Sequence, residues 1–482
     1  MSKIRNALIF SALGQYSVQI ISFALIIALA RILTPAEIGV YAIAGAVSIL
    51  AMELRSLGVP QFIVREENLD DTLVRQALGM TVMVSWGLGA FIAVTAPLVA
   101  DFYNEMALTN ILWIMSLSFL IAPFTCIPMA LLKREMEFGP VFIQQFVGAV
   151  VNAGSTITLV LLGYSYYGLA WGVLIGMIAE LFVGIYYQPP GTPWIPSFTW
   201  LGKLVKFGFF TSTAQMVTRF SESIPDLVIG RFATMTDVGL FSRGLGTVLF
   251  LNRIIVSAVS AAILPHLSEV LRSGGSIEKE YLRAIKLQAA FTWPIFAVVN
   301  VAAFPMINAL FGDQWDHAAA LASVLAIWSM FASIHCFAPS ALIASGDEKI
   351  LFITSVVVFV FRLALVIVAA PYGLIAVSWA MVVSGVIEFI AMSVAIKRTI
   401  GLDFSQFFVA FIPNFIVTIL CWSVAVGLDY LLSFETANPW QSIAYLAVIM
   451  PIIWLLSLRL TKHEAWGLAL SFFRKTIPNN VR

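Results

Sequence analysis

The sequence predicts an all-α polytopic membrane protein, and three observations lead to this fold class. The chain has 482 residues, of which 60% are hydrophobic. Only 11% are Asp, Glu, Lys or Arg, against about 25% in an ordinary soluble domain. The apolar runs are continuous and about 20 residues long, as a helix that crosses a bilayer requires, and about twice as long as a β-barrel strand. These features exclude a soluble enzyme, a disordered chain and a membrane protein with a large water-soluble domain.

Apolar runs bounded by charges, proline and glycine predict about fourteen transmembrane helices. Lysine and arginine give the orientation, because cytoplasmic loops are enriched in both. Most of the 27 basic residues fall in the two termini and in the hairpins on the same side, whereas Arg31 and Arg231 fall on the opposite side. Both termini are therefore predicted to be cytoplasmic. The predicted spans are 8–30, 38–60, 77–100, 108–132, 140–162, 166–187, 207–230, 239–265, 287–311, 318–344, 350–370, 373–396, 405–432 and 440–460.

Two halves of the chain resemble each other. Residues 31–41 match residues 231–241, and weaker matches, including Glu180 with Glu388, follow in the same order. The first span then corresponds to the seventh in the same orientation. The sequence therefore predicts two parallel six-helix repeats related by an axis along the membrane normal, with a cleft between two lobes.

This repeat sets the predicted domain organisation. Four prolines in residues 188–203 favour an extended connector over a helix. The last two spans have no counterpart in the repeat and are interpreted as an appended pair. The predicted parts are an N-lobe (1–187), a Pro-rich cytoplasmic connector (188–206), a C-lobe (207–398), the appended spans 13 and 14 (399–462) and a cytoplasmic tail (463–482).

Five arginines fall inside the predicted spans. An arginine at the centre of a membrane helix costs roughly 2.5–3.5 kcal/mol on insertion scales, so we expect these side chains to line a partly hydrated cavity. The guanidinium fork matches phosphate oxygens, which favours an anionic headgroup as the ligand. The alternative is that each arginine pairs with a nearby acid or caps a carbonyl. The candidate residues of this cationic cavity are Arg219, Arg253, Arg55, Arg243 and Arg362.

Three acidic residues within the spans are candidates for cation coupling: Glu222, Asp226 and Glu53. Glu222 and Asp226 lie four residues apart on one helix face, and Pro225 between them could open the backbone. Arg219 is within intrahelical ion-pair reach of Glu222. The alternative is therefore a self-neutralised trio that lets this helix insert at low cost.

No motif for enzymatic chemistry is present. The phosphate-binding pattern GxxxxGK[ST], the zinc pattern HExxH and a DxD pattern are absent. The three cysteines form neither a disulfide framework nor a CxxC pattern. The four histidines lack metal-ligand spacing. We therefore expect no enzymatic activity, no metal site and no cofactor. The histidines are His266, His317, His335 and His463.

The segment Ala30–Tyr41 (ARILTPAEIGVY), followed by Leu57-Gly58-Val59 and Arg65, resembles the polysaccharide-transport branch of the multidrug/oligosaccharidyl-lipid/polysaccharide flippase superfamily. The resemblance covers essentially the whole chain. It implies a V-shaped pair of lobes, a cationic central cavity and a location in the bacterial inner membrane. It also implies transport of an undecaprenyl-pyrophosphate-linked oligosaccharide to the outer leaflet. In this superfamily about fourteen spans are typical of peptidoglycan-precursor flippases and some exopolysaccharide members, and many O-antigen members have about twelve.

The predicted function is a flippase that works by alternating access in exopolysaccharide or lipopolysaccharide biosynthesis. A hydrated sugar-pyrophosphate headgroup cannot cross hydrocarbon without replacement partners, whereas the prenyl tail can stay in lipid, between the lobes or along spans 13 and 14. The expected partners are the lipid-linked oligosaccharide, the bilayer, a polysaccharide polymerase and export machinery, and no nucleic acid. One alternative is a drug/cation antiporter of the same fold, which the excess of arginine over acids disfavours. The other is a membrane scaffold, which the buried arginines and the repeat disfavour.

Overall fold

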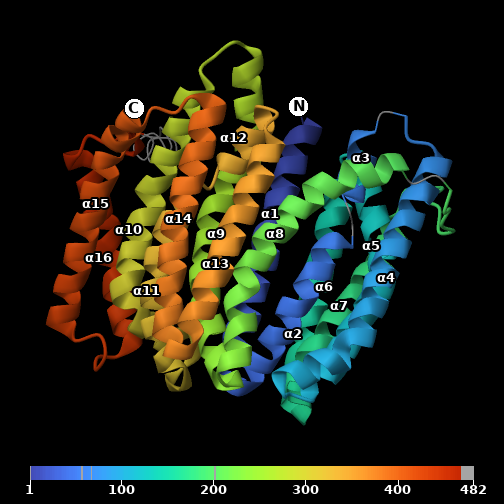
Figure 1. Ribbon diagram of the computed structural model, residues 1–482, viewed down its shortest axis with the longest axis horizontal. Helices are drawn as coiled ribbons and strands as arrows, with labels where there is room; N and C mark the ends of the chain where they lie inside the picture. Colours follow the sequence, from blue (N-terminus) through green and yellow to red (C-terminus); the bar gives the residue numbers. More distant parts are fainter. Residues whose placement is uncertain (1, 56–57, 67, 200–201, 468–482) are drawn as a thin grey trace, which may run out of the picture. The chain divides into compact units, whose positions relative to one another are not determined.

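The structure, a computed structural model, describes residues 2–55, 58–66, 68–199 and 202–467 (Figure 1). The described residues form helices joined by short turns and contain no strand. Contacts divide the chain into two compact units, unit 1 (residues 1–239) and unit 2 (residues 240–482). Unit 1 includes the seventh predicted span, which the repeat assigns to the C-lobe. The predicted lobes, defined by sequence matching, stay a prediction.

Unit 1 holds eight helices among its described residues, and the first turn of a ninth. The chain of unit 1 bends sharply at a π-helical turn, Val160–Tyr164, where Gly163 has a φ of 91°. The helices are α1 (Ser2–Ile32), α2 (Pro35–Leu54), α3 (Val59–Arg65), α4 (Asp71–Tyr103), α5 (Ala107–Arg134), α6 (Phe138–Leu159), α7 (Ser165–Tyr187), α8 (Gly202–Phe232) and the start of α9 (Met235–Arg272).

Unit 2 continues α9; α10 packs against α11, α15 and α16, and α14 packs against α11 and α13. Its described helices are α10 (Ile277–Phe311), α11 (Asp316–Ile334), α12 (Ala338–Ala344), α13 (Glu348–Ala369), α14 (Leu374–Ile400), α15 (Phe404–Leu432) and α16 (Pro439–Leu460). Short 3-10 turns at Asp313–Trp315 and Ala370–Tyr372 connect α10 to α11 and α13 to α14.

The described residues contain 11 helical stretches that are long and apolar enough to cross a membrane. One of them, Phe138–Tyr187, holds both α6 and α7, which pack against each other. Large apolar side chains stay exposed along the outer helices, for example Phe408, Ile412 and Phe415 on α15. These features confirm an all-helical, multi-pass membrane protein.

Helix α2 ends earlier than predicted. The span was predicted over residues 38–60, but the helix ends at Leu54. The chain turns at Gly58, which adopts the left-handed conformation with a φ of 68° before α3 begins. Arg55 is therefore the C-cap residue of α2, and its predicted position inside a span was wrong. Gly58 favours the left-handed turn that follows α2. Pro60 favours the start of a new helix, α3.

Two further differences concern helix continuity. Helix α8 runs unbroken through Pro225, so the backbone opening expected there is absent. A proline inside a membrane helix is tolerated where the surrounding protein bonds the backbone groups that it frees. The predicted span 318–344 is instead interrupted between α11 and α12, at residues 335–337.

His335 holds this interruption in place. Its Nδ1 lies 2.7 Å from the Tyr281 hydroxyl of α10, and its Nε2 lies 2.7 Å from Ser393 Oγ of α14. All three side chains are buried, and the imidazole stacks on the rings of Tyr281, Phe389 and Phe407. At this break between α11 and α12, the imidazole therefore connects the chain to α10 and α14 through two side-chain hydrogen bonds.

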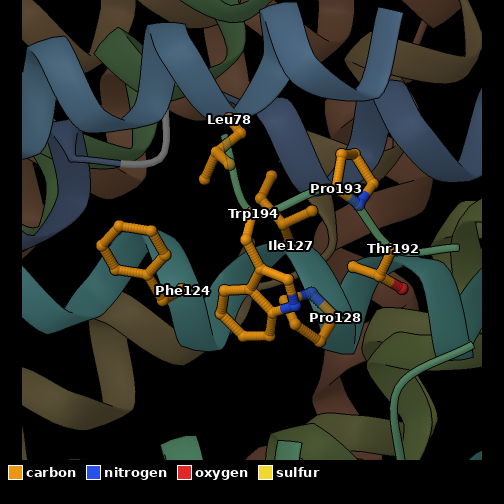
Figure 2. A pocket seen from close by; sticks show the side chains of 7 residues that line it. All are labelled: Leu78, Phe124, Ile127, Pro128, Thr192, Pro193 and Trp194. Atoms are coloured by element: carbon orange, nitrogen blue, oxygen red, sulfur yellow. The ribbon is translucent and has the colours of Figure 1, made fainter. Parts of the chain in front are cut away.

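The connector is bound to unit 1. Its residues 188–199 contain no helix, as the prolines predicted, whereas residues 202–206, also predicted as connector, form the first turn of α8. The Ser197 N–H donates to the Arg75 carbonyl of α4 at 2.9 Å, and the ring of Trp194 stacks on Phe124 of α5 with centroids 6.0 Å apart. Trp194, Pro193 and Thr192 close an apolar crevice over Leu78, Phe124, Ile127 and Pro128 (Figure 2).

The two appended helices are held to α10 by polar contacts as well as apolar packing. On α15, Asn414 donates to the carbonyl of Lys286 at 3.0 Å and Trp422 to Asn300 Oδ1 at 3.2 Å. On α16, Trp454 donates to the carbonyl of Ala290 at 2.8 Å. These bonds fix α15 and α16 as an integral part of unit 2.

The matched segments at residues 31–41 and 231–241 form the same helix cap. At the start of α2, the Thr34 N–H and hydroxyl donate to the Glu37 carboxylate at 2.8 and 2.9 Å, and the Glu37 N–H donates to Thr34 Oγ1. At the start of α9, Thr234 and Asp237 repeat this reciprocal capping box, at 3.0 and 2.7 Å. The matched residues are thus explained by a local requirement of the backbone.

Close backbone packing explains the matched glycines, Gly39 and Gly239. A methyl group at Gly39 would overlap the carbonyl oxygen of Met235, and one at Gly239 would overlap that of Pro35. All four residues belong to unit 1, where the first turns of α2 and α9 cross in backbone contact. Glycine is required at both positions because any side chain would push the two helix starts apart.

We expect Gly39→Ala to lower the free energy of unfolding by about 1–3 kcal/mol, because the added methyl meets backbone atoms that cannot rotate away. Gly45→Ala is the matched control on the same helix, since no atom lies within 4 Å of the added carbon. Thermal unfolding in detergent measures both. Equal midpoints for the two variants would contradict the assigned backbone contact.

We expect His335→Phe to lower the free energy of unfolding by about 2–4 kcal/mol, because two buried hydroxyl groups lose their partner at about 1–3 kcal/mol each. Removing those hydroxyls as well, in the triple variant with Tyr281→Phe and Ser393→Ala, should recover part of the loss. The same unfolding measurement checks this. A triple variant less stable than His335→Phe would show that the hydrogen bonds are not the cause.

Candidate functional site

Arg219 lies on α8 beside the predicted coupling acids. Its Nη1 lies 3.3 Å from Glu222 Oε2, one turn along the helix. The Arg219 side chain is 44% exposed and that of Glu222 28% exposed, so the pair stays open on one side. Asp226 is half-buried one turn further on. The predicted ion-pair contact of Arg219 with Glu222 is confirmed, and the coupling role of these acids stays a prediction.

Arg253 lies on α9 with its side chain exposed, two turns beyond the exposed Gly246. Arg55, at the end of α2, is half-buried. The Glu53 side chain lies outside the described residues, so its predicted coupling role stays a prediction. Arg219, Arg253 and Arg55 therefore present guanidinium groups that are not enclosed by the protein.

Arg243 is enclosed by aromatic rings. Its guanidinium carbon lies 5.0 Å from the ring centroid of Phe311 and 5.0 Å from that of Trp315, both in unit 2. Trp315 is completely buried. A guanidinium within about 6 Å of an aromatic face is attracted by the ring quadrupole, and the attraction grows when water is excluded. This environment attaches α9 to the end of α10.

Arg362 forms a buried ion pair. The side chain, on α13, is 4% exposed, and its Nη2 lies 2.6 Å from Glu388 Oε2 of α14. Its Nε donates to Ser384 Oγ at 3.1 Å, and the Trp328 ring lies beneath the guanidinium at 5.6 Å. Arg362 therefore pairs with an acid, which was the alternative to lining a cationic cavity.

A polar seam between α6 and α7 was missed by the sequence analysis. Along α6, Gln144, Asn152 and Thr156 face glycines of α7, and Glu180 of α7 lies over Gly148 of α6. Each of these four contacts joins one glycine and one polar side chain, whereas Gly168 lies against Val160 and Leu159. The signal in the sequence was the spacing of four residues in the α7 stretch of Gly168, Gly172, Gly176, Glu180 and Gly184.

No group of three or more His, Cys, Asp or Glu side chains that could hold a metal ion occurs among the described residues. The candidate site is therefore built from guanidinium groups, carboxylates and amides. Such a set binds anions through charge-assisted hydrogen bonds and exchanges protons through its carboxylates.

These features define a helical transporter-like membrane protein, and comparison with solved structures agrees on the fold. The lipid II flippase MurJ in an inward closed conformation superimposes with a TM-score of 0.74 at 16% identity, covering 96% of this chain and 100% of MurJ. An inward-facing multidrug resistance MATE family transporter of the MOP superfamily gives a TM-score of 0.57 at 14% identity, covering 82% of this chain and 98% of the transporter.

Residues 28–320 match the family described as polysaccharide biosynthesis protein, and the chain belongs to that family. The teichuronic acid biosynthesis protein TuaB of Bacillus subtilis is 22% identical over 418 residues, which are 86% of this chain and 85% of TuaB. The lipopolysaccharide biosynthesis protein WzxC of Escherichia coli is 20% identical over 421 residues, 85% and 84% of the two chains. The succinoglycan biosynthesis transport protein ExoT of Rhizobium meliloti is 23% identical over 305 residues, 62% and 60%. The predicted family is confirmed.

We expect Arg362→Met to lower the free energy of unfolding by about 3–5 kcal/mol, because it leaves the Glu388 carboxylate without its cation. Replacing both partners, with Glu388→Leu added, should restore most of the stability, since an apolar pair carries no desolvation cost. Unfolding midpoints of purified protein measure both variants. A double variant no more stable than the single one would show that the ion pair is not what Arg362 contributes.

Proposed function

We propose that this chain is a flippase that moves an undecaprenyl-pyrophosphate-linked oligosaccharide from the cytoplasmic to the outer leaflet of the bacterial inner membrane. The observation that carries the proposal is the exposure of Arg219 and Arg253 within membrane-length helices. An arginine inside a membrane-spanning helix is costly to expose to lipid, so these side chains are assigned to water or to an anionic cargo. Family membership and the names of the biosynthesis relatives support the same cargo class.

The chemistry of the cargo fits this arrangement. A pyrophosphate and its sugars lose several hydrogen bonds on leaving water, at about 2–7 kcal/mol for each unsatisfied polar group. Guanidinium groups replace that hydration with paired, charge-assisted hydrogen bonds to phosphate oxygens. The prenyl tail requires no such replacement and stays in the bilayer. The protein therefore acts as a transporter and needs no reaction centre.

The proposed roles of the five arginines differ. Arg55, Arg219 and Arg253 bind the anionic headgroup. Arg243 and Arg362 are assigned to the packing of α9 and α13, because aromatic rings enclose one and an acid neutralises the other. Glu222, Asp226 and Glu53 remain candidates for coupling to a cation.

The proposed topology has fourteen crossings with both termini in the cytoplasm. The count is reached when α6 and α7 are counted separately and α2 and α8 are added to the 11 apolar stretches. The crossings are arranged as two parallel six-helix repeats followed by α15 and α16, and the two lobes alternate in access to the two sides. A polysaccharide polymerase and export machinery, in an exopolysaccharide or lipopolysaccharide pathway, are the proposed partners.

The second candidate is a drug/cation antiporter, since the fold is shared with multidrug transporters. The pairing of Glu222 with Arg219 disfavours it, because a neutralised acid attracts a cationic drug less strongly. Transport of a fluorescent cationic drug by the purified protein in vesicles, without flipping of a lipid-linked oligosaccharide, would decide for the antiporter.

We expect Arg219→Ala and Arg253→Ala each to reduce flipping at least about tenfold, the loss of one charged hydrogen bond of about 1.5–3 kcal/mol. Lys203→Ala, which changes a basic residue in the first turn of α8, is the control and should export normally. Flipping of a fluorescent lipid-linked oligosaccharide in proteoliposomes, and polysaccharide export in cells at matched protein levels, measure the effect. Full activity of both arginine variants would rule out the proposed headgroup site.

A further inference from the structure

The segment that follows α16 is held against α10 within unit 2. Helices α10, α15 and α16 pack against one another (Figure 1). Beyond the end of α16, Glu464 Oε1 lies 2.5 Å from Arg283 Nη2 of α10. Ala465 is buried in one apolar cluster with Ala290 of α10. His463 directly precedes these two residues in the chain and therefore lies beside the first half of α10.

His463 places a buried hydrogen-bond donor in this contact. The residue is 3% exposed, and its Nδ1 accepts the N–H of Ala465 at 3.0 Å. Burial lowers the pKa of His463 to about 4, and the positive charge of Lys286 on α10 acts in the same direction, so the ring is neutral near neutral pH. A neutral imidazole that accepts at Nδ1 carries its proton on Nε2. That Nε2 is buried and has no hydrogen-bond partner within the described residues.

Lys286 adds a cation on the face of α10 that meets this segment. It lies three residues after Arg283 and four before Ala290, so the three side chains project from one face of the helix. Side chains of a helix lean toward its N-terminus, which directs the Lys286 ammonium toward the level of Arg283 and its partner Glu464. Lys286 is half-buried, and its ammonium group forms no hydrogen bond or ion pair with the residues that the structure describes.

The two groups, Lys286 Nζ and His463 Nε2, are both hydrogen-bond donors, so they cannot bond each other. The neighbouring carboxylate of Glu464 is already held by Arg283. Buried donors in proteins almost always have a partner, so a buried N–H without one indicates a ligand that brings an acceptor. An ammonium and an N–H group together favour an anion, and phosphate oxygens accept such bonds strongly.

The position of the two donors favours a lipid phosphate over a free anion. Lys286 immediately precedes the ninth predicted span, and His463 follows the last residue of α16, Leu460, by three residues. Both therefore lie at the boundary of the apolar layer, where the phosphates of a bilayer are. Ile452, Leu456 and Leu460 are exposed at intervals of four residues. They form an apolar stripe that runs along α16 to the same end.

We propose that Lys286 and His463 form a binding site for the phosphate of an anionic phospholipid, in the leaflet on the side of the C-terminus. The phosphate oxygens accept hydrogen bonds from Lys286 Nζ and His463 Nε2, and an acyl chain lies along the exposed stripe of α16. The bound lipid joins α10 to the segment after α16. The site is separate from the headgroup site proposed on α8 and α9, and it does not depend on the cargo.

The test measures the affinity of a fluorescent phosphatidylglycerol for the purified full-length protein in detergent. Lys286→Gln and His463→Asn should each bind the probe about tenfold more weakly than the wild type, since each removes one hydrogen bond to a charged group. The asparagine keeps an acceptor for the Ala465 N–H and removes the Nε2 donor, which separates the lipid contact from the local backbone contact. Wild-type affinity in both variants would overturn the proposal.

Three controls accompany this measurement. Lys279→Gln, an exposed lysine two turns earlier on α10, should bind as the wild type. Arg219→Ala should also bind as the wild type, and a loss of affinity there would show that the probe occupies the proposed cargo site instead. Unlabelled phosphatidylglycerol should displace the probe, whereas inorganic phosphate should not. Equal displacement by inorganic phosphate would overturn the assignment to a lipid.

Thermal unfolding of the wild type keeps the test independent of how well the variants fold. A ligand that binds only the folded state raises the unfolding midpoint in proportion to the logarithm of its concentration above the dissociation constant. Phosphatidylglycerol should therefore raise the midpoint more than phosphatidylcholine, whose headgroup carries its own cation. Equal shifts with the two lipids would contradict a site built from two donors for an anionic phosphate.

Discussion

A charged side chain in the membrane interior needs either a partner or water, and this requirement organises the structure. The chain meets it in three ways. Arg362 has an acid on the adjacent helix, Arg243 has two aromatic faces, and Arg219 has an acid one turn along its own helix. The more completely neighbouring groups compensate the charge of an arginine, the more that arginine serves the packing of the helices. Under the proposed function, the exposed arginines are the candidates for binding an anionic cargo.

Close backbone contact is the second constraint, and glycine makes it possible. The start of α2 crosses the start of α9 at Gly39 and Gly239, and α6 meets α7 along a row of glycines. Helices in lipid associate through packing and hydrogen bonds rather than through the hydrophobic effect, so small residues set where they meet. In the α6–α7 seam, the glycines leave space for the polar side chains of Gln144, Asn152, Thr156 and Glu180.

The two halves share their helix caps but not the neutralisation of their matched acids. Thr34 and Thr234 form equivalent hydrogen bonds in the caps of α2 and α9. Glu180 and Glu388 do not, because Arg362 has no equivalent on α6.

Sequence alone determined the helical membrane fold, the family and most of the helix positions, because hydropathy, charge and capping are local properties of the chain. It also identified all five arginines and the pairing of Arg219 with Glu222. The early end of α2, the break at His335 and the seam at Glu180 emerged only from the tertiary structure. Arg362 meets Glu388 from 26 residues away. Which charges meet across such a separation depends on how helices pack in space, and packing brings together residues that no local pattern connects.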